Sequence, residues 1–340
     1  MARLVGRLID ELAGAAERYD LRPRTIYFGG GTPTLLPTSQ WDRLFQALAA
    51  AGLPDATIEF TTEANPETLD AGAVEHLVAG GVNRMSIGAQ SFDEGLLAAL
   101  GRRHSPEAIG EAVRAARLAG VGQVGLDLMF TIPGQTMATL EADIDAALGL
   151  EPDHLGYYQL TIEPGTPLAE DVATGRIEPA GEELQRQMYA RVIDRLGAAG
   201  FEHYEISNWA RPGCRCRHNM TYWTGGDYLG FGPSASSYVA GQRWKNAANL
   251  DAYLAAERPP TTDHEQLQPP RRAGEQIMLR LRLIEGMERQ WLKHALPADD
   301  ARWSALRELI AAGLLEETAT HMRLTREGVF LADAVISQLL

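Results

Sequence analysis

Hydrophobic and polar positions follow two different periods along the first two-thirds of the chain. Short runs rich in β-branched and aromatic residues, such as TIYFGG at residues 25–30, have the length and composition of β-strands. Between these runs, apolar residues recur every three or four positions, as on one face of an amphipathic helix. The predicted strands are residues 25–30, 57–66, 82–91, 124–134 and 154–167, and the predicted helices between them are residues 39–52, 70–81, 93–101, 105–120 and 136–150. Repeated strand–helix units predict an α/β protein with a parallel sheet and right-handed crossovers.

Polar side chains gather where the predicted strands end. Glu63 and Asn65 close the second strand, Gln90 closes the third, and Asp127 lies in the fourth. A barrel of parallel strands carries its chemistry on this rim, whereas an open Rossmann-like sheet gathers its ligand groups at one switch point. The distribution over successive strands therefore favours a barrel-type sheet.

The first twenty residues read as a helix. Apolar residues from Leu4 to Leu12 fall on one helical face, and Asp10 and Glu11 interrupt what would be the apolar core of a signal peptide. No apolar run is long enough to span a bilayer. With only two cysteines and no secretory segment, the chain is expected in the reducing cytoplasm.

The last third of the chain has a different pattern. A helix pattern at residues 182–200 leads into an irregular stretch rich in glycine and aromatic residues, and a proline-rich segment at 256–272 reads as a linker. Later helix and hairpin patterns predict a small winged-helix-like α+β domain; they lie at residues 273–286, 301–317, 320–328 and 329–340. The expected domains are a barrel over residues 1–200, an extension over 201–258 and a C-terminal domain over 259–340.

Charge argues against nucleic acid as a partner. The formal net charge of the 340 residues is -14, and residues 271–340 contain ten Lys or Arg and ten Asp or Glu. A neutral wing reads DNA poorly, so a protein-binding or lid role is expected for the C-terminal domain.

Three consecutive glycines, Gly29 to Gly31, follow the first predicted strand. The spacing is not that of a phosphate-binding P-loop, and no Lys follows. It is also not a G-x-G-x-x-G turn that opens directly into a helix, because Pro33 and Pro37 delay the next helix. The stretch fits either a tight turn or a backbone cradle for an anion, a carboxylate or an ammonium group.

Four further residues join this loop as candidates: Glu63, Gln90, Arg102 and Asp127. Each has a structural alternative as a helix cap, a loop contact or a solvated charge. Together with the glycine loop they match a zwitterionic ligand with hydroxyls and a flat base. Carboxylates suit an ammonium group and ribose hydroxyls, and a guanidinium suits a carboxylate.

The segment CRCRHNMTYW, residues 214–223, is the second unusual stretch. Cys214 and Cys216 make an incomplete metal site, and two surface cysteines are the simpler expectation. His218 fits either a haem-iron ligand or a hydrogen-bonded histidine beside a packed aromatic cluster. The residues that would line a flat apolar ligand or let it come close are Tyr222, Trp223, Tyr228, Gly230, Phe231 and Gly232.

Several ordered motifs resemble the radical S-adenosylmethionine proteins related to oxygen-independent coproporphyrinogen III dehydrogenase. They are YFGGGTPTLL, EANPETL, GVNRMSIGAQSFD, LGRRHS and DLMFTIPGQT, and the resemblance extends over nearly the whole chain. It implies a (β/α)6-type partial barrel, an accessory C-terminal domain, and S-adenosylmethionine with its methionine moiety at the glycine loop. The implied cofactor-binding residues are Gly30, Gly31, Thr32, Glu63, Gln90, Arg102 and Asp127.

The family also carries C-x-x-x-C-x-x-C, which holds a [4Fe-4S] cluster on the first barrel strand. This chain opens directly on the first helix, and its two cysteines are fewer than the three thiolates that the cluster needs. We therefore expect a fragment, or a start codon assigned too late, with the first strand and the cluster loop missing. Because a missing strand exposes the edge of its neighbour, poor solubility is also expected.

The H-N-x-x-Y-W pattern and the glycine-rich segment after it resemble the haem chaperone branch of this family, which implies that His218 binds haem. The implied role is delivery of haem to respiratory proteins, with membrane contact only through the acceptor. Two alternatives stay open: a radical enzyme that oxidises coproporphyrinogen III in porphyrin biosynthesis, and a phosphate-binding barrel enzyme.

Overall fold

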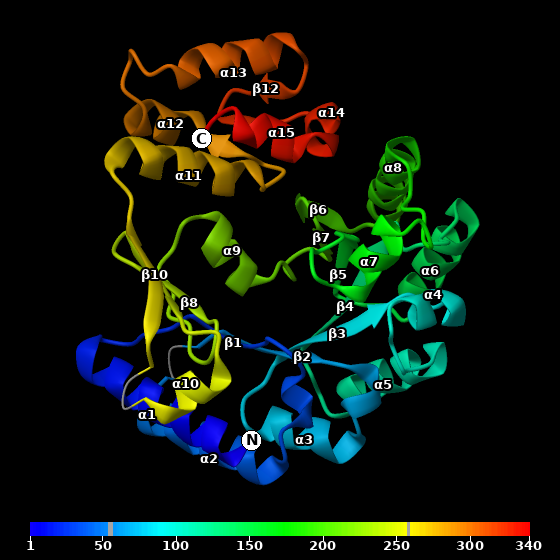
Figure 1. The fold of residues 1–340 in the computed structure, drawn as a ribbon, viewed down its shortest axis with the longest axis vertical. Coiled ribbons are helices and arrows are strands. Elements are labelled where there is room, and N and C mark those ends of the chain that lie inside the picture. The colour runs from blue at the N-terminus through cyan, green and yellow to red at the C-terminus, as the bar shows by residue number, and fades with distance from the viewer. Residues whose placement is uncertain (54–56, 257–258) are drawn as a thin grey trace. The chain divides into compact units, whose positions relative to one another are not determined.

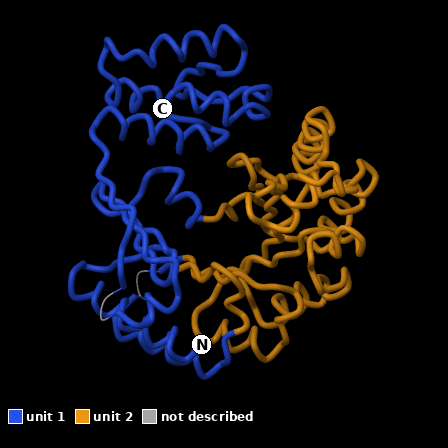
Figure 2. The backbone as a smooth tube through the Cα atoms, viewed as in Figure 1, with its two compact units in different colours: residues 1–25, 36–58, 217–340 blue, residues 26–35, 59–216 orange. Residues whose placement is uncertain are grey.

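A computed structural model describes residues 1–53, 57–256 and 259–340 of the chain. These residues form two compact units, which are coloured separately in Figure 2. Unit 1 comprises residues 1–25, 36–58 and 217–340, and unit 2 comprises residues 26–35 and 59–216. This division differs from the expected domains, whose boundaries at residues 200 and 258 remain predictions. In the described residues, no helix has the length and apolar character needed to cross a membrane.

Unit 2 is built on a seven-stranded sheet in the order β1-β2-β3-β4-β5-β7-β6. From β2 to β5 the strands run parallel, and β7 pairs antiparallel with both β5 and β6. The strands are β1 Thr25–Phe28, β2 Glu59–Ala64, β3 Arg84–Gln90, β4 Gln123–Phe130, β5 His154–Gln159, β6 Glu202–Glu205 and β7 Asn208–Ala210. The curled sheet confirms the predicted α/β partial barrel (Figure 1). The antiparallel hairpin of β6 and β7 was not predicted.

The helices of unit 2 begin at capping side chains. Asp70, Asp93, Ser105 and Thr136 each accept a hydrogen bond from a backbone N–H of the first turn. The helices are α3 Ala71–Ala79, α4 Glu94–Ala99, α5 Pro106–Leu118, α6 Met137–Gly149, α7 Pro167–Ala173 and α8 Glu182–Ala198, with 3-10 turns at Pro33–Leu35 and Pro66–Thr68. Helices α5 and α8 contact the central strands and bury one face of the sheet. All the helices predicted between the strands are present, and α7 is additional.

Unit 1 begins with the predicted amphipathic helix, α1 (Ala2–Arg18), which buries its apolar side. Glu11 on this helix accepts hydrogen bonds from the Gly232 N–H at 2.9 Å and from the Tyr253 hydroxyl at 2.6 Å. Its other carboxylate oxygen accepts one from Asn246 Nδ2 at 2.6 Å. One carboxylate therefore ties the N-terminal helix to a segment more than 200 residues away.

A small antiparallel sheet, β10-β9-β8, lies in the same unit. Its strand β10 falls inside the proline-rich segment that the sequence predicts as a linker, and it pairs with β9. Two residues of that predicted linker, 257 and 258, lie outside the described residues. The elements of this region are α2 Thr38–Ala50, α9 Arg217–Trp223, β8 Ser236–Val239, β9 Gln242–Asn246, α10 Leu250–Ala255 and β10 Thr261–Gln266.

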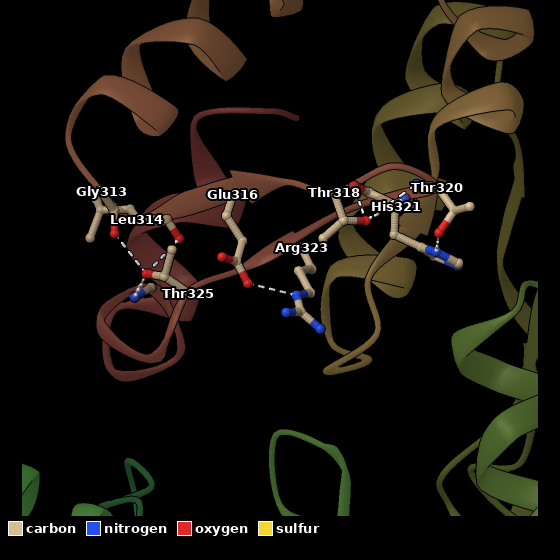
Figure 3. Close-up of polar contacts among 9 residues, drawn as sticks. Gly313, Leu314, Glu316, Thr318, Thr320, His321, Arg323 and Thr325 are labelled. Atoms are coloured by element: carbon tan, nitrogen blue, oxygen red, sulfur yellow. Dashed lines mark hydrogen bonds and ion pairs between the residues drawn. The ribbon is translucent and has the colours of Figure 1, made fainter.

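The C-terminal part of unit 1 combines helices with a three-stranded sheet, β11-β13-β12. It is the expected winged-helix-like arrangement, with α12 and β11 as elements that the pattern did not predict. Figure 3 shows the β12–β13 hairpin, where Arg323 Nε donates to Glu316 at 2.7 Å and Thr325 caps the next helix through the Gly328 N–H. The elements are α11 Pro269–Leu281, β11 Met287–Glu288, α12 Arg289–Ala295, α13 Arg302–Ala311, β12 Leu315–Glu317, β13 His321–Leu324, α14 Arg326–Phe330 and α15 Ala332–Ser337.

Candidate functional site

One face of the unit 2 sheet is lined by polar residues and glycines. Side chains alternate between the two faces of a strand, and the apolar alternates of β3, such as Met85 and Ile87, are fully buried. The opposite face carries Tyr27 and Gly29 at β1, Glu59, Thr61 and Glu63 on β2, Arg84, Ser86, Gly88 and Gln90 on β3, Asp127 on β4, and Gly156 and Tyr158 on β5. Most of the predicted cofactor residues therefore share this polar face or the loop at its edge.

Glu63 reaches the glycine loop from the carboxyl end of β2. Its Oε1 accepts a hydrogen bond from the Tyr27 hydroxyl at 2.8 Å, and its Oε2 accepts one from the Gly30 N–H at 3.1 Å. A Cβ on Gly29 would lie 2.8 Å from Oε1, so glycine is needed there to leave room for the carboxylate. Burial, and then the charge of Glu63, raise the pKa of Tyr27 well above its usual value, which keeps this hydroxyl a donor.

The glycine loop adopts a backbone conformation that requires glycine. Gly30 and Gly31 have φ angles of 80° and 111°, a region that residues with a Cβ rarely enter. Both are exposed, and a Cβ built on either would meet no atom within 4 Å. Thr32, the next residue, accepts a hydrogen bond from Asn65 Nδ2 at 2.8 Å. The loop is therefore anchored at both ends while the backbone between them stays accessible to a ligand.

Asp127 projects from β4 onto the same polar face. Its Oδ2 accepts a hydrogen bond from the Ser86 hydroxyl at 2.7 Å, and a Cβ on Gly156 would lie 2.7 Å from its Oδ1. Burial raises the pKa of Asp127 to about 6; the charge of Glu63 adds to this, while the Ser86 hydrogen bond opposes it. A carboxyl shifted toward neutral pH is found at binding and catalytic sites more often than elsewhere.

Gln90 ends β3 with a φ of 65°, a strained value for a residue with a side chain. Buried contacts hold the backbone on both sides of it. Asp143 accepts a hydrogen bond from the Ser91 hydroxyl at 2.9 Å, and the His104 ring donates from Nε2 to the Ala89 carbonyl at 3.1 Å. Strain that the surroundings enforce is characteristic of functional positions.

Arg102 stands apart from the other candidates. Its side chain is exposed, and its backbone N–H donates to the Leu97 carbonyl at 2.9 Å, which closes helix α4. In the described part of the chain, no hydrogen bond or ion pair joins its guanidinium to the polar face. The structure therefore brings together the loop, Glu63 and Asp127, but does not attach Arg102 to them.

His218 lies in unit 1, on the short helix α9, and is half-buried. Its Nδ1 is 2.9 Å from the Thr25 hydroxyl, and its Nε2 is 2.8 Å from the Tyr222 hydroxyl. The Tyr222 ring meets that of Tyr228 edge to face, with centroids 4.7 Å apart. The structure thus shows a hydrogen-bonded histidine beside aromatic rings, and the role of His218 as a haem ligand stays a prediction.

The glycines after this motif serve the protein's own backbone. A Cβ on Gly230 would lie 2.2 Å from the Ser236 carbonyl oxygen, so strand β8 occupies the space that the sequence suggested for a ligand. Gly232 has a φ of 104° and donates its N–H to Glu11. These contacts within the protein explain Gly230 and Gly232 without a ligand.

The expectation of two surface cysteines is wrong for Cys216, which is only 2% exposed. Its Sγ lies 3.6 Å from Glu59 Oε1. Arg84 is itself 2% exposed; burial lowers the pKa of its guanidinium, but its electrostatic interactions with Cys216 and Glu59 raise that pKa above its usual value. Sequence reasoning missed this cluster because its members come from three segments; the only signal was a charged residue inside an otherwise apolar strand pattern. Neither Cys214 nor Cys216 forms a disulfide within the described residues.

Two family models match separate parts of the chain. Residues 4–147 match the Radical SAM superfamily, and residues 267–331 match the HemN C-terminal domain. The solved structure of coproporphyrinogen III oxidase (HemN) from Escherichia coli, a radical SAM enzyme, has a TM-score of 0.85 and 20% identity, and the match covers 99% of this chain and 82% of that one. At 20% identity, this similarity establishes the fold alone. The match to the Radical SAM superfamily, together with this fold, defines a protein of the radical SAM class.

Sequence relatives identify the family within that class. The heme chaperone HemW of Bacillus subtilis (strain 168) is 34% identical over 323 residues, which are 93% of this chain and 85% of the relative. HemW of Mycobacterium tuberculosis (strain ATCC 25618 / H37Rv) is 36% identical over 334 residues, which are 97% of this chain and 84% of the relative. The chain belongs to the HemW family.

Proposed function

We propose that this protein is a haem chaperone of the cytoplasm that binds haem through His218, holds S-adenosylmethionine on the polar face of unit 2, and passes haem to respiratory proteins. The observation that carries the proposal is the identity of 34% and 36% with proteins named heme chaperone HemW, over nearly the whole chain. The two free cysteines accord with a reducing compartment.

The haem ligand in this proposal is the His218 imidazole. Both of its nitrogens have hydroxyl partners, so one partner leaves when iron binds. Tyr222 is one turn further along the same short helix. Rotation of this single side chain frees Nε2 without moving the backbone, whereas the Thr25 contact continues to orient the ring.

The polar face fits S-adenosylmethionine by the chemistry of its groups. The accessible backbone of residues 30–32 suits the methionine moiety, and the carboxyls of Glu63 and Asp127 suit an ammonium group and ribose hydroxyls. Gln90 offers an amide for the remaining polar edge, and the exposed Arg102 offers a guanidinium to a carboxylate. These roles are proposals, supported by the shared face of Glu63 and Asp127.

A [4Fe-4S] cluster does not fit the cysteines of this chain. Three thiolates are needed, and the sequence contains two, one of them buried against Glu59. Over the described ranges, no group of three or more His, Cys, Asp or Glu residues is placed to hold a metal ion.

Haem titration followed by absorbance tests the haem ligand. The wild-type protein is expected to bind haem and to show an imidazole-ligated spectrum, and His218→Ala is expected to lose that spectrum and at least about tenfold in affinity. His264→Ala serves as the control, because His264 is exposed in the same unit. Full affinity in His218→Ala would remove the ligand assignment. Anaerobic oxidation of coproporphyrinogen III by the protein would overturn the chaperone in favour of an enzyme.

Calorimetric titration with S-adenosylmethionine tests the second site. Glu63→Gln and Asp127→Asn are each expected to weaken binding by about tenfold, the loss typical of a charged hydrogen bond. Glu94→Gln, an exposed acidic residue in the same unit, is expected to bind as the wild type does. Equal binding by all four proteins would contradict the proposed site.

A further inference from the structure

Unit 1 contains a cavity of about 600 Å³ at the start of its C-terminal helices, and the proposed function does not yet use it. Its walls come from helices α11 and α12, from the end of β10 and from the two residues after α9, all of which are labelled or adjacent to labels in Figure 1. A volume of this size is typical of sites for small organic ligands. The lining residues are Thr224, Gly225, Gln266, Leu267, Gln268, Pro269, Arg272, Ala273, Gln276, Arg280, Trp291 and Ala295.

The lining of this cavity is cationic, although the chain as a whole carries a net charge of -14. Among the described lining residues are two arginines, three glutamines and one tryptophan, and none is an aspartate or glutamate. Arg272, Gln276 and Arg280 are spaced by four residues on α11, which places them on one face of that helix. The helix therefore presents a row of donors to the cavity.

Arg280 is the central group of this row. Its guanidinium lies 4.5 Å from the centre of the Trp291 ring, and its Nη2 donates to the Thr224 carbonyl at 3.1 Å. Its buried Nε has no hydrogen-bond partner within the described residues. Burial lowers the pKa of Arg280, and the charge of Glu288 opposes this only in part. A half-buried cation with an unused donor is costly unless an anion joins it.

Arg272 supplies the second cation at the cavity edge. Its side chain is exposed and makes no hydrogen bond or ion pair within the described chain. Two guanidiniums on one helix face, two turns apart, suit two carboxylates of one ligand, because each can bind a carboxylate with two parallel hydrogen bonds. The flat Trp291 ring beside Arg280 suits an aromatic ligand body.

We propose that this cavity receives the two propionate carboxylates of a tetrapyrrole, with Arg280 and Arg272 as their partners. The inference rests on the proposed haem-binding function and extends it from the iron to the carboxylate edge. Thr224 and Gly225 follow α9 directly, and His218 lies six residues before Thr224. Along a helix this separation is roughly 9 Å, so one short element carries the iron ligand at one end and reaches the carboxylate cavity at the other.

Three ligands test the iron ligand and the carboxylate cavity independently: haem, metal-free protoporphyrin IX and the dimethyl ester of haem. Haem has iron and free carboxylates, protoporphyrin IX lacks the iron, and the ester lacks the free carboxylates. Arg272→Gln and Arg280→Gln are each expected to weaken binding of haem and of protoporphyrin IX by about tenfold. Both variants are expected to bind the ester as the wild type does. Arg271→Gln is the matched control, because it removes the same charge from the same helix outside the cavity.

The outcomes distinguish the inference from the proposed function. If the wild-type protein does not bind haem, the proposed function fails. If it binds haem, and Arg272→Gln and Arg280→Gln bind it as tightly as Arg271→Gln, the propionate site is wrong while the chaperone stands. An equal loss of affinity for haem and for its dimethyl ester would also overturn the propionate site, since the arginines would then act without carboxylates. Because Arg272 is exposed, its variant keeps the test valid even if Arg280→Gln lowers stability.

Discussion

Replacing Asp127 by Asn is expected to stabilise the folded protein at neutral pH while weakening the proposed cofactor site. Burial raises the pKa of this carboxyl from 3.8 to about 6 in the folded state. Between pH 3.8 and about pH 6, this carboxyl is therefore protonated more fully in the folded protein than in the unfolded chain. The associated stabilisation is complete below pH 3.8 and is lost as the pH rises through about 6. At pH 7.5 the ionised carboxylate therefore costs stability that an amide would not.

The size of this cost follows from the shift in pKa. A shift from 3.8 to about 6 corresponds to about 3 kcal/mol. Protein atoms surround Asp127, yet part of its surface stays accessible to water, so solvent screening reduces the effect to about 1–3 kcal/mol. Asn has nearly the same shape, and its amide oxygen can still accept the hydrogen bond from Ser86, which lies 2.7 Å from the carboxylate. A larger side chain would not fit beside Gly156.

Urea unfolding of both proteins at pH 4.5 and pH 7.5 measures the effect without any ligand. The free energy of unfolding of Asp127→Asn, relative to wild type, is expected to rise by about 1–3 kcal/mol between the two pH values. Asp10→Asn, an exposed carboxylate on α1, is the control for the general effect of removing a charge. A variant that is destabilised equally at both pH values would refute the reasoning, because the buried carboxylate would then be fully compensated by its neighbours.

Three further predictions concern contacts within each unit, and urea unfolding tests each of them. Gly156→Ala is expected to cost about 1–3 kcal/mol, because its Cβ would lie 2.6 Å from the Tyr158 ring. Gly149→Ala is the control: no atom lies within 4 Å of its Cβ, so stability is expected to change by less than about 0.5 kcal/mol. Equal effects of the two substitutions would contradict this prediction. Arg84→Met is expected to cost about 3 kcal/mol, because it removes a buried cation whose charge interacts favourably with buried Glu59. Adding Glu59→Gln is expected to recover part of the loss, and a double variant no better than the single one would count against this interaction. Glu11→Ala is expected to cost about 2–3 kcal/mol because it leaves three donors without their acceptor, and an unchanged midpoint would show that water replaces the carboxylate.

The regular part of the fold could be predicted from the sequence because its signals are local. Each parallel strand is a short apolar run between polar loops, and helices such as α5 begin at a visible cap, here Ser105 before Pro106. The predicted boundaries of β3 and α5 fall within two residues of the observed ones. The strands of the β6–β7 hairpin, which escaped prediction, are four and three residues long, too short for a period to appear.

The candidate site could be predicted only as a set of residue types. Positions at strand ends showed that Glu63 and Asp127 would share a rim, because parallel strands end at one edge of the sheet. They gave no sign that Cys216 would be buried against Glu59, since that contact joins residues 157 positions apart. Polar residues become buried through partners that are distant in sequence, and no local pattern records them.

The glycines show most clearly what could not be predicted from the sequence alone. Gly29 and Gly156 are needed because a Cβ would come within 2.8 Å of the Glu63 or Asp127 carboxylate, so they make room for side chains of the candidate site. Gly230 is needed because a Cβ would meet the Ser236 carbonyl oxygen at 2.2 Å, so it makes room only for the protein's own backbone. Gly29 and Gly230 occur in glycine-rich stretches that suggest a ligand, whereas Gly156 is the only glycine of its strand. Whether a glycine makes room for a carboxylate or for the backbone depends on the atoms that face it in the folded protein. A glycine-rich motif therefore predicts that some group comes close to the backbone, but not which group.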